Sequence, residues 1–217
     1  MRLDRLPEQY IPADVLTYYN GLWQGREPGF VHASQYRWGH AEERKARIVA
    51  LAKDLAEREG LTTCLEVGCC EGIMTQELAV VFGQVTAVDI VPAFIRNCPA
   101  LPNVAYAVRD IEHWTPGGSF GLIVVAEVLE HLREPAAAVR RLVGHCRYLL
   151  ASCPISEELN PDTCDASLFM QENKNGDAAG HLWAMDMEGF ASLFAGLEAV
   201  YQEEFGPTGI VMVRGEA

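Results

Sequence analysis

The chain has 217 residues, of which 49% are hydrophobic and 22% are charged; this is enough for one α/β domain with a sizeable core, but hardly for two domains. Seventeen Lys and Arg against 30 Asp and Glu give a net charge of −13, so a phosphate backbone would be repelled and nucleic acid is a disfavoured partner. No apolar run approaches the roughly 20 residues that span a bilayer, and the first residues lack the apolar core of a cleaved secretion signal.

The cysteine pattern indicates the cellular compartment. There are seven cysteines, an odd number, and no two of them have Cys-x-x-Cys spacing. This pattern is typical of free thiols in a reducing environment. We therefore expect a cytoplasmic protein with no membrane partner.

Residues 1–39 are rich in aromatic side chains, interrupted by Pro and Gly. They lack the periodicity of an amphipathic helix and predict an arm or lid that covers the rest of the chain. Residues 40–217 would then form the main domain. Exposed aromatics in the arm could also mediate a homodimer.

A helix is predicted over His40–Glu59, because apolar residues recur at helical spacing and Gly60 follows as a stop signal. Strands and helices then alternate along the chain. The predicted strands are Thr62–Val67, Val85–Asp89, Val104–Arg109, Phe120–Ala126, Tyr148–Cys153, Glu198–Phe205 and Ile210–Arg214. The predicted helices are Gly72–Phe82, Pro92–Cys98, Glu127–His131, Pro135–His145 and Asp186–Phe194.

This alternation predicts an α/β fold with a Rossmann-like sheet of seven strands, mostly parallel, and helices on both faces. A tight turn over residues 206–209 joins the last two strands, so the final strand must run antiparallel. The run Phe120–Ala126 is apolar throughout, as expected of a central strand that is buried on both faces.

The first candidate site is the glycine loop that follows the first predicted strand. The strand ends in an acid, Glu66, and a loop with Gly68 and Gly72 leads into a helix; a nucleotide-like ligand binds at this place in open α/β sheets. A dinucleotide fingerprint needs Gly-x-Gly-x-x-Gly. Counted from Gly68, the other two positions hold Cys70 and Ile73, so NAD and FAD are disfavoured.

Two further acids follow the next two predicted strands. Asp89 can accept hydrogen bonds from both hydroxyls of a ribose. Asp110 can accept one from an adenine amino group, with Ile90 and Ile111 on the two faces of the ring. Three acids at three consecutive strand ends suit a nucleoside that carries no phosphate.

These motifs carry a family resemblance. The chain resembles the class I S-adenosylmethionine-dependent methyltransferases in an ordered set of features: Glu66-x-Gly68-x-x-x-Gly72, Asp89, Asp110 and Phe120–Leu132. The resemblance implies S-adenosyl-L-methionine as cofactor, with its methionine part at Glu66, Gly68 and Gly72, its ribose at Asp89 and its adenine at Asp110. Cys70 stands where the family usually has its middle glycine. In this replacement by a small residue the chain resembles a subgroup that includes the nodulation N-methyltransferases.

The second candidate site is Glu127-Val128-Leu129-Glu130-His131, directly after the central strand. On a helix, Glu127, Glu130 and His131 would share one arc. Two carboxylates and an imidazole can bind a divalent metal, take a proton from a substrate, or position it. We expect His131 to be the general base and Glu127 to hold the acceptor or the cofactor end.

The same string resembles a segment shared by ubiquinone-pathway O-methyltransferases and by metal-dependent small-RNA 2′-O-methyltransferases. The latter resemblance implies, as an alternative, a metal site of Glu127, Glu130, His131 and the later His181. Residues 156–204 are rich in acids and carry one base, Lys174, which argues against RNA.

The expected function is methyl transfer from S-adenosylmethionine to oxygen or nitrogen of a small molecule, without a metal. Two alternatives stay open: a metal-dependent RNA 2′-O-methyltransferase, and a non-catalytic domain that binds the cofactor or a partner.

Overall fold

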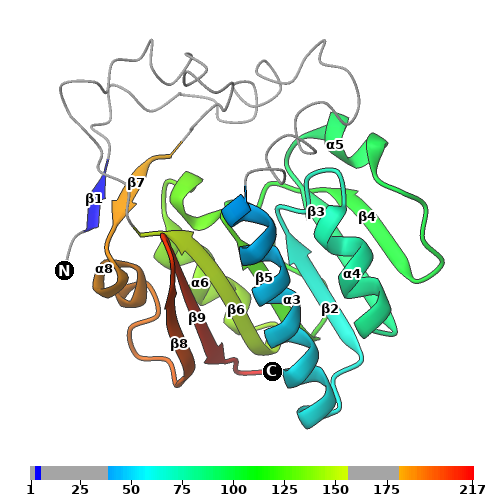
Figure 1. Ribbon diagram of the computed structural model, residues 1–217. Coiled ribbons are helices and arrows are strands. Elements are labelled where there is room, and N and C mark those ends of the chain that lie inside the picture. Colours follow the sequence, from blue (N-terminus) through cyan, green and yellow to red (C-terminus); the bar gives the residue numbers. More distant parts are fainter. Residues whose placement is uncertain (1–2, 6–38, 156–180) are drawn as a thin grey trace.

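One sheet of seven strands organises the chain, in the order β4-β3-β2-β5-β6-β9-β8. Figure 1 shows it in the computed structural model, which describes residues 3–5, 39–155 and 181–217. The strands are β2 (Thr63–Val67), β3 (Gln84–Asp89), β4 (Val104–Val108), β5 (Phe120–Ala126), β6 (Cys146–Pro154), β8 (Ala199–Phe205) and β9 (Thr208–Arg214).

Strands β2 to β6 pair in parallel, and β9 is antiparallel to both of its neighbours, β6 and β8. The predicted Rossmann-like sheet of seven strands, with an antiparallel last strand, is therefore confirmed. Because the turn between β8 and β9 is tight, β9 pairs with β8 and separates it from β6.

Helices cover both faces of the sheet (Figure 1). They are α3 (Gly39–Glu59), α4 (Ile73–Val81), α5 (Pro92–Asn97), the single 3₁₀ turn η2 (Leu129–His131), α6 (Pro135–Val143) and α8 (Met187–Ser192). The side chain of Asp186 accepts a hydrogen bond from the Gly189 N–H and caps α8. None of the helices among the described residues combines the length and apolarity needed to cross a membrane.

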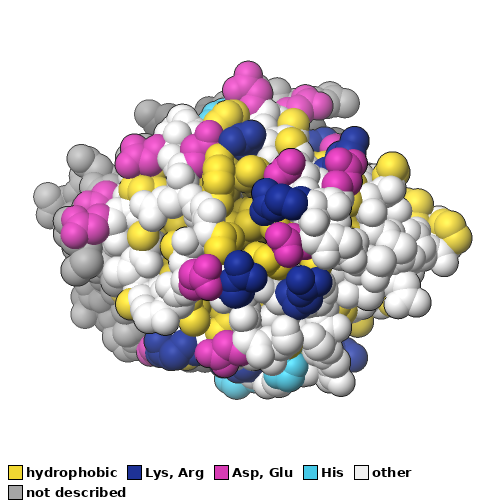
Figure 2. Space-filling view, turned by 90° about the horizontal axis from the view of Figure 1, so that it is seen from below, with side chains coloured by type: hydrophobic (Ala, Val, Ile, Leu, Met, Phe, Trp, Pro, Cys, Tyr) yellow, Lys and Arg dark blue, Asp and Glu magenta, His cyan; other side chains and the backbone are white. Residues whose placement is uncertain are grey.

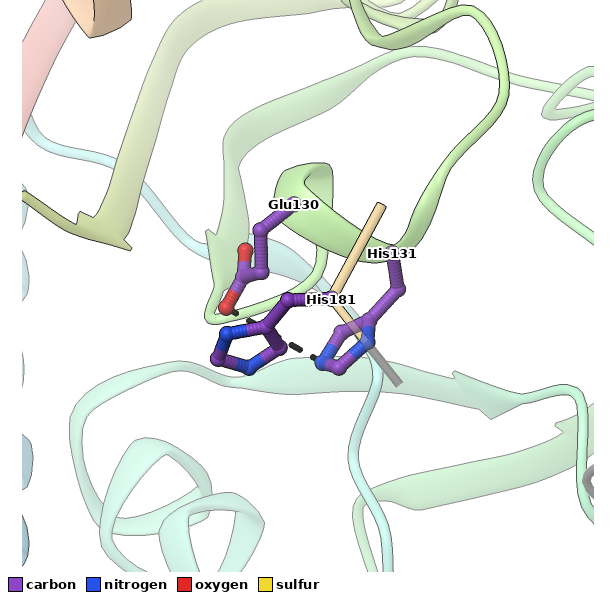
Figure 3. Close-up of side chains that lie close together, drawn as sticks. All are labelled: Glu130, His131 and His181. Atoms are coloured by element: carbon purple, nitrogen blue, oxygen red, sulfur yellow. Dashed lines mark ion pairs between the residues drawn. The ribbon is translucent and has the colours of Figure 1, made fainter. Parts of the chain in front are cut away.

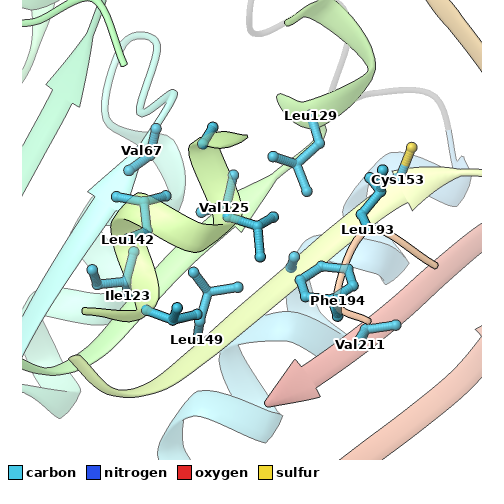
Figure 4. Close-up of a cluster of buried hydrophobic side chains, with 14 of the residues drawn as sticks. Val67, Ile123, Val125, Leu129, Leu142, Leu149, Cys153, Leu193, Phe194 and Val211 are labelled. Carbon is cyan, nitrogen blue, oxygen red and sulfur yellow. The ribbon is translucent and has the colours of Figure 1, made fainter. Parts of the chain in front are cut away.

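The central strand β5 is buried on both sides, as its continuous apolar run predicts. Leu122 and Val124 pack against α3 and α4, whereas Ile123 and Val125 belong to the cluster beneath α6 and α8 (Figure 4). Burial of each such side chain contributes about 1.5–3 kcal/mol. The sheet is thus a firm base for the loops at its strand ends.

Two short strands were not predicted. Strand β1 (Leu3–Arg5) pairs antiparallel with β7 (Trp183–Met185) in a separate two-stranded sheet. The predicted arm over residues 1–39 otherwise lies outside the described residues, apart from the first residue of α3. The domain boundary at residue 39 stays a prediction.

Candidate active site

The carboxyl ends of the parallel strands meet at the upper edge of the sheet in Figure 1. Glu66 is the second-to-last residue of β2, Asp89 is the last residue of β3, and Glu127 directly follows β5. Residues far apart in the sequence are thereby brought to one edge, where open α/β sheets bind their ligands.

Glu66 is a buried acid, with 1% of its surface exposed. The Thr75 hydroxyl of α4 donates a hydrogen bond of 2.6 Å to its carboxylate. Burial raises the pKa of Glu66 to about 8, against the opposing effect of the Thr75 bond. The carboxyl group is therefore largely neutral at neutral pH.

This shift predicts a pH dependence of stability. Because the pKa of Glu66 is about 8 in the fold and near 4.5 otherwise, its contribution is fully present below about pH 4.5 and is lost as the pH rises through about 8. Glu66→Gln is therefore expected to flatten the fall of the unfolding free energy over this range. Denaturant titrations at stepped pH measure the effect, and Glu57→Gln, at an exposed position of α3, should leave the fall unchanged.

Asp89 anchors the glycine loop. Its Oδ2 accepts the Cys70 N–H at 2.9 Å and its Oδ1 accepts the Val91 N–H at 2.8 Å. Burial raises the pKa of Asp89 to about 6, while these backbone bonds lower it. Each carboxylate oxygen can accept a second hydrogen bond, so the side chain keeps acceptor capacity for a ligand.

Both the backbone conformation at position 68 and the close approach of Val128 require a glycine there. Its φ is +77°, in the left-handed region, and a Cβ built on it would lie 2.3 Å from Cγ2 of Val128. The glycine loop is thus packed directly against the residue that precedes η2. Cys70 also has a positive φ, of 49°, which is costly for a side-chain-bearing residue.

The Asp110 carboxylate already has two partners. Its Oδ1 accepts the Glu112 N–H, and its Oδ2 lies 2.6 Å from Nδ1 of His113. Ile111 packs into the core, whereas Ile90 is half-buried. The assignment of these residues to adenine stays a prediction.

The prediction of a helix over Glu127–His131 was wrong. Only Leu129–His131 form a turn, which is 3₁₀, and Glu127 has a left-handed φ of 54°. The reason is that Glu127 still belongs to the sheet through its N–H, which donates to the Ser152 carbonyl at 3.1 Å. Glu127, Glu130 and His131 therefore do not share one arc of a helix.

Glu127 is held by two residues that the sequence analysis missed. The Ser152 hydroxyl donates to Oε1 at 2.8 Å, and Nη1 of Arg44 lies 3.2 Å from Oε2. Strand β6 provides Ser152 and the first turns of α3 provide Arg44. No local pattern marks either residue, because both reach Glu127 through the fold.

Glu130, His131 and His181 converge, as Figure 3 shows. One ligand atom of each residue lies within 4.8 Å of those of the other two, and the two imidazole rings are 4.7 Å apart, edge to face. Glu130 is 1% exposed, and its carboxylate oxygens accept no hydrogen bond from any other described residue. Burial, and the nearby Glu127, raise the pKa of Glu130 to about 8.

Two hydrogen bonds hold this cluster together across 50 residues of sequence. The Leu182 N–H donates to the Glu130 carbonyl at 2.7 Å, and the Trp183 indole N–H donates to the Leu132 carbonyl at 2.8 Å. His181 is thereby fixed beside His131. Of the four predicted metal-site residues, the structure brings three together, while Glu127 is engaged with Ser152 and Arg44.

The hydrogen-bond acceptors at this edge suit a nucleoside that carries a free amino acid group. The acids Glu66 and Asp89 can accept hydrogen bonds from hydroxyl and amino groups, and the glycine loop brings its backbone close to them.

A family model described as a methyltransferase domain matches residues 65–147. Nodulation protein S of Rhizobium tropici is 35% identical over 119 residues, which are 52% of this chain and 48% of that protein. A ubiquinone biosynthesis O-methyltransferase of Xanthomonas axonopodis pv. citri is 31% identical over 83 residues, 35% of each chain.

Among solved structures, the N-methyltransferase NodS from Bradyrhizobium japonicum, in complex with S-adenosyl-L-homocysteine, aligns with a TM-score of 0.64. The alignment covers 94% of this chain and 100% of that one, at 19% identity. The chain is similar to methyltransferases over residues 65–147 and shares the fold of the N-methyltransferase NodS. The chain spans about half the length of the curated nodulation proteins that it matches. The family model, over residues 65–147, includes the glycine loop and the segment from Glu127 to His131.

Proposed function

We propose that this methyltransferase transfers the methyl group of S-adenosyl-L-methionine to nitrogen or oxygen of a small molecule, with nitrogen favoured. The observation that carries the proposal is the contact between Gly68 and Val128. It joins the loop proposed to hold the cofactor to the turn with Glu130 and His131. An acceptor at this turn would lie beside the cofactor.

The proposed cofactor residues are those of the glycine-loop edge. Glu66, Gly68 and Gly72 hold the methionine part, and Asp89 accepts the ribose hydroxyls. Asp110 accepts the adenine amino group, with Ile90 and Ile111 beside the ring. When bound, the cofactor supplies a methyl group on a sulfonium, which needs only a well-placed nucleophile with a free electron pair.

His131 is the proposed general base, because an imidazole can take a proton near neutral pH. Glu127, fixed by Ser152 and Arg44, is proposed to orient the acceptor. The Glu127 carboxylate favours an amine, since it can accept a hydrogen bond from an ammonium group, whose proton His131 then removes. The N-methyltransferase named among the structural relatives supports this preference.

A methyl-transfer assay with paired acceptors tests the proposal. The protein is incubated with labelled S-adenosylmethionine and either a primary amine or its hydroxyl counterpart, for example glucosamine and glucose within a wider panel. We expect label on amines more than on matched alcohols. Transfer to the alcohols alone would contradict the preference for nitrogen, and binding of the cofactor without transfer to any member would favour a non-catalytic binding domain.

The cluster of Glu130, His131 and His181 supports a second candidate function, a metal-dependent methyltransferase that acts on RNA. A buried carboxylate and two imidazoles are ligands that divalent transition metals prefer. Charge argues against RNA: the chain carries 30 Asp and Glu against 17 Lys and Arg, and on the face seen from below in Figure 2 acidic side chains are interspersed with basic ones. Arg58, Arg147 and Arg214 each pair with a neighbouring acid. We therefore favour the small-molecule function.

Chelation separates the two candidates. Because His131 is proposed to act as a base and not as a ligand, prolonged treatment with EDTA is expected to leave the rate of methyl transfer unchanged. Loss of activity that Mn²⁺ or Co²⁺ restores, together with labelling of RNA, would establish the second candidate instead. A His131→Asn variant, whose turnover is expected to be strongly reduced, serves as the background for the label.

The proposed compartment is the cytoplasm, supported by the six cysteines of the described residues, all of which are free thiols. A homodimer through the aromatic residues before position 39 stays a prediction, since that segment lies outside the described residues. Equilibrium ultracentrifugation measures the oligomeric state.

A further inference from the structure

Two thiols, one in the glycine loop and one at the end of α5, play no part in the proposed reaction. Sγ of Cys98 is 3.3 Å from the Cys70 carbonyl oxygen and 3.4 Å from that of Phe94. Sγ of Cys69 is 3.7 Å from the same Cys70 oxygen. The two sulfurs therefore meet at one carbonyl.

The pair connects two elements that both border the proposed cofactor site. Cys69 belongs to the loop between Gly68 and Gly72, and Cys98 caps the end of α5. A Cβ built on Gly72 would lie 3.4 Å from Sγ of Cys98. A covalent bond between the two sulfurs would consequently tie the loop to α5.

The two thiols differ in their access to solvent. Cys69 is buried, with 3% of its surface exposed, whereas Cys98 is half-buried. The neighbouring Cys98 thiol and burial raise the pKa of Cys69 well above its ordinary range. A reagent in solution therefore meets Cys98 first, with Cys69 directly behind it as the resolving thiol.

We propose that Cys69 and Cys98 are a modification site for low-molecular-weight disulfides, and that the bridge formed there lowers the affinity for S-adenosylmethionine. The Cys98 thiolate attacks the disulfide, forms a mixed disulfide and releases one thiol. Cys69 then attacks the Cys98 sulfur and displaces the second thiol. Two protein thiols become one disulfide, and the oxidant leaves as two thiols with the two protons.

The bridge would weaken cofactor binding by displacing the loop. Both thiol hydrogens that point at the Cys70 carbonyl are lost, and the loop is drawn toward α5. Cys70 holds a left-handed φ, and its N–H donates to Asp89, the acid proposed for the ribose. This consequence rests on the proposed function, whereas formation of the bridge does not.

Peptide mapping tests whether the disulfide forms, and calorimetry tests whether it lowers the affinity for the cofactor. The full chain is equilibrated in oxidised or reduced glutathione, alkylated and digested without reduction, and its affinity for S-adenosylhomocysteine is measured. We expect a Cys69–Cys98 linked peptide, about 2 Da lighter than its two parts, and an affinity at least about tenfold weaker that dithiothreitol restores. Fragment spectra distinguish Cys69 from its neighbour Cys70.

Matched variants make the result specific. Cys98→Ser should bind S-adenosylhomocysteine equally in both buffers, and Cys146→Ala, which removes a buried thiol of β6, should behave like the unchanged chain. No linked peptide, a link to Cys70, or a link without loss of affinity would each overturn the proposal. Failure of the reduced protein to bind would instead contradict the proposed function, and the linked peptide would still decide whether the bridge forms.

Discussion

Replacement of His131 by asparagine is expected to lower kcat by about 10²- to 10⁴-fold, the usual contribution of a general base. Asparagine keeps the size and polarity of the side chain but cannot take a proton. Since the proposed cofactor residues lie at or after the ends of β2, β3 and β4, the affinity for S-adenosylhomocysteine should stay unchanged. Steady-state kinetics and calorimetry on the same preparation measure the two quantities.

The pH profile gives a second readout. If the acceptor is an amine, it loses its proton without help at high pH, so the deficit of His131→Asn should shrink as the pH rises. His145→Asn is the control, because its ring contacts the Gly118 carbonyl, at the start of β5 and away from the strand ends that form the site. Unchanged turnover and an unchanged pH profile in the His131 variant would show that another group is the base.

A second large effect is expected from Gly68→Ala. The left-handed backbone costs alanine about 1–2 kcal/mol, and the clash with Val128, at 2.3 Å, adds about 1–3 kcal/mol of overpacking. We expect the unfolding free energy to fall by about 3 kcal/mol, and Tm to fall by about 10 °C. Binding of S-adenosylhomocysteine should be lost, because the loop cannot keep its path between β2 and η2.

Two further variants separate the cost of the left-handed backbone from the cost of the clash with Val128. Gly60→Ala has a similar φ of +65° but nothing within 4 Å of the new Cβ, so it should show the backbone cost alone. Val128→Ala combined with Gly68→Ala removes the clash and should recover part of the lost stability. If the double variant were no more stable than Gly68→Ala, the contact with Val128 would not be the cause.

The fold could be predicted from the sequence because its signals are local. The apolar run of β5, the stop at Gly60 and the glycine turn before β9 each reflect the chemistry of neighbouring residues, and all seven strands of the main sheet were located to within a few residues. The convergence of Glu66 and Asp89 follows from parallel strands whose carboxyl ends share one edge.

The geometry after β5 could not be predicted in this way. A helical period places Glu127 beside Glu130, yet the hydrogen bond to Ser152 keeps Glu127 in the sheet and turns its backbone to a left-handed φ. Arg44 and Ser152 reach Glu127 from α3 and β6, so their role depends on packing that no sequence window contains. The three-residue strands β1 and β7 are likewise too short to leave a periodic signal.

The pairing of β1 with β7 has a practical consequence for anyone who prepares this protein. Strand β7 begins two residues after His181, so Leu3–Arg5 pair with the segment that carries one histidine of the Glu130, His131 and His181 cluster. A purification tag or fusion partner at the amino terminus would therefore lie next to that segment and could disturb the pairing of β1 with β7. The carboxyl terminus, which lies at the opposite edge of the sheet in Figure 1, is the better point of attachment.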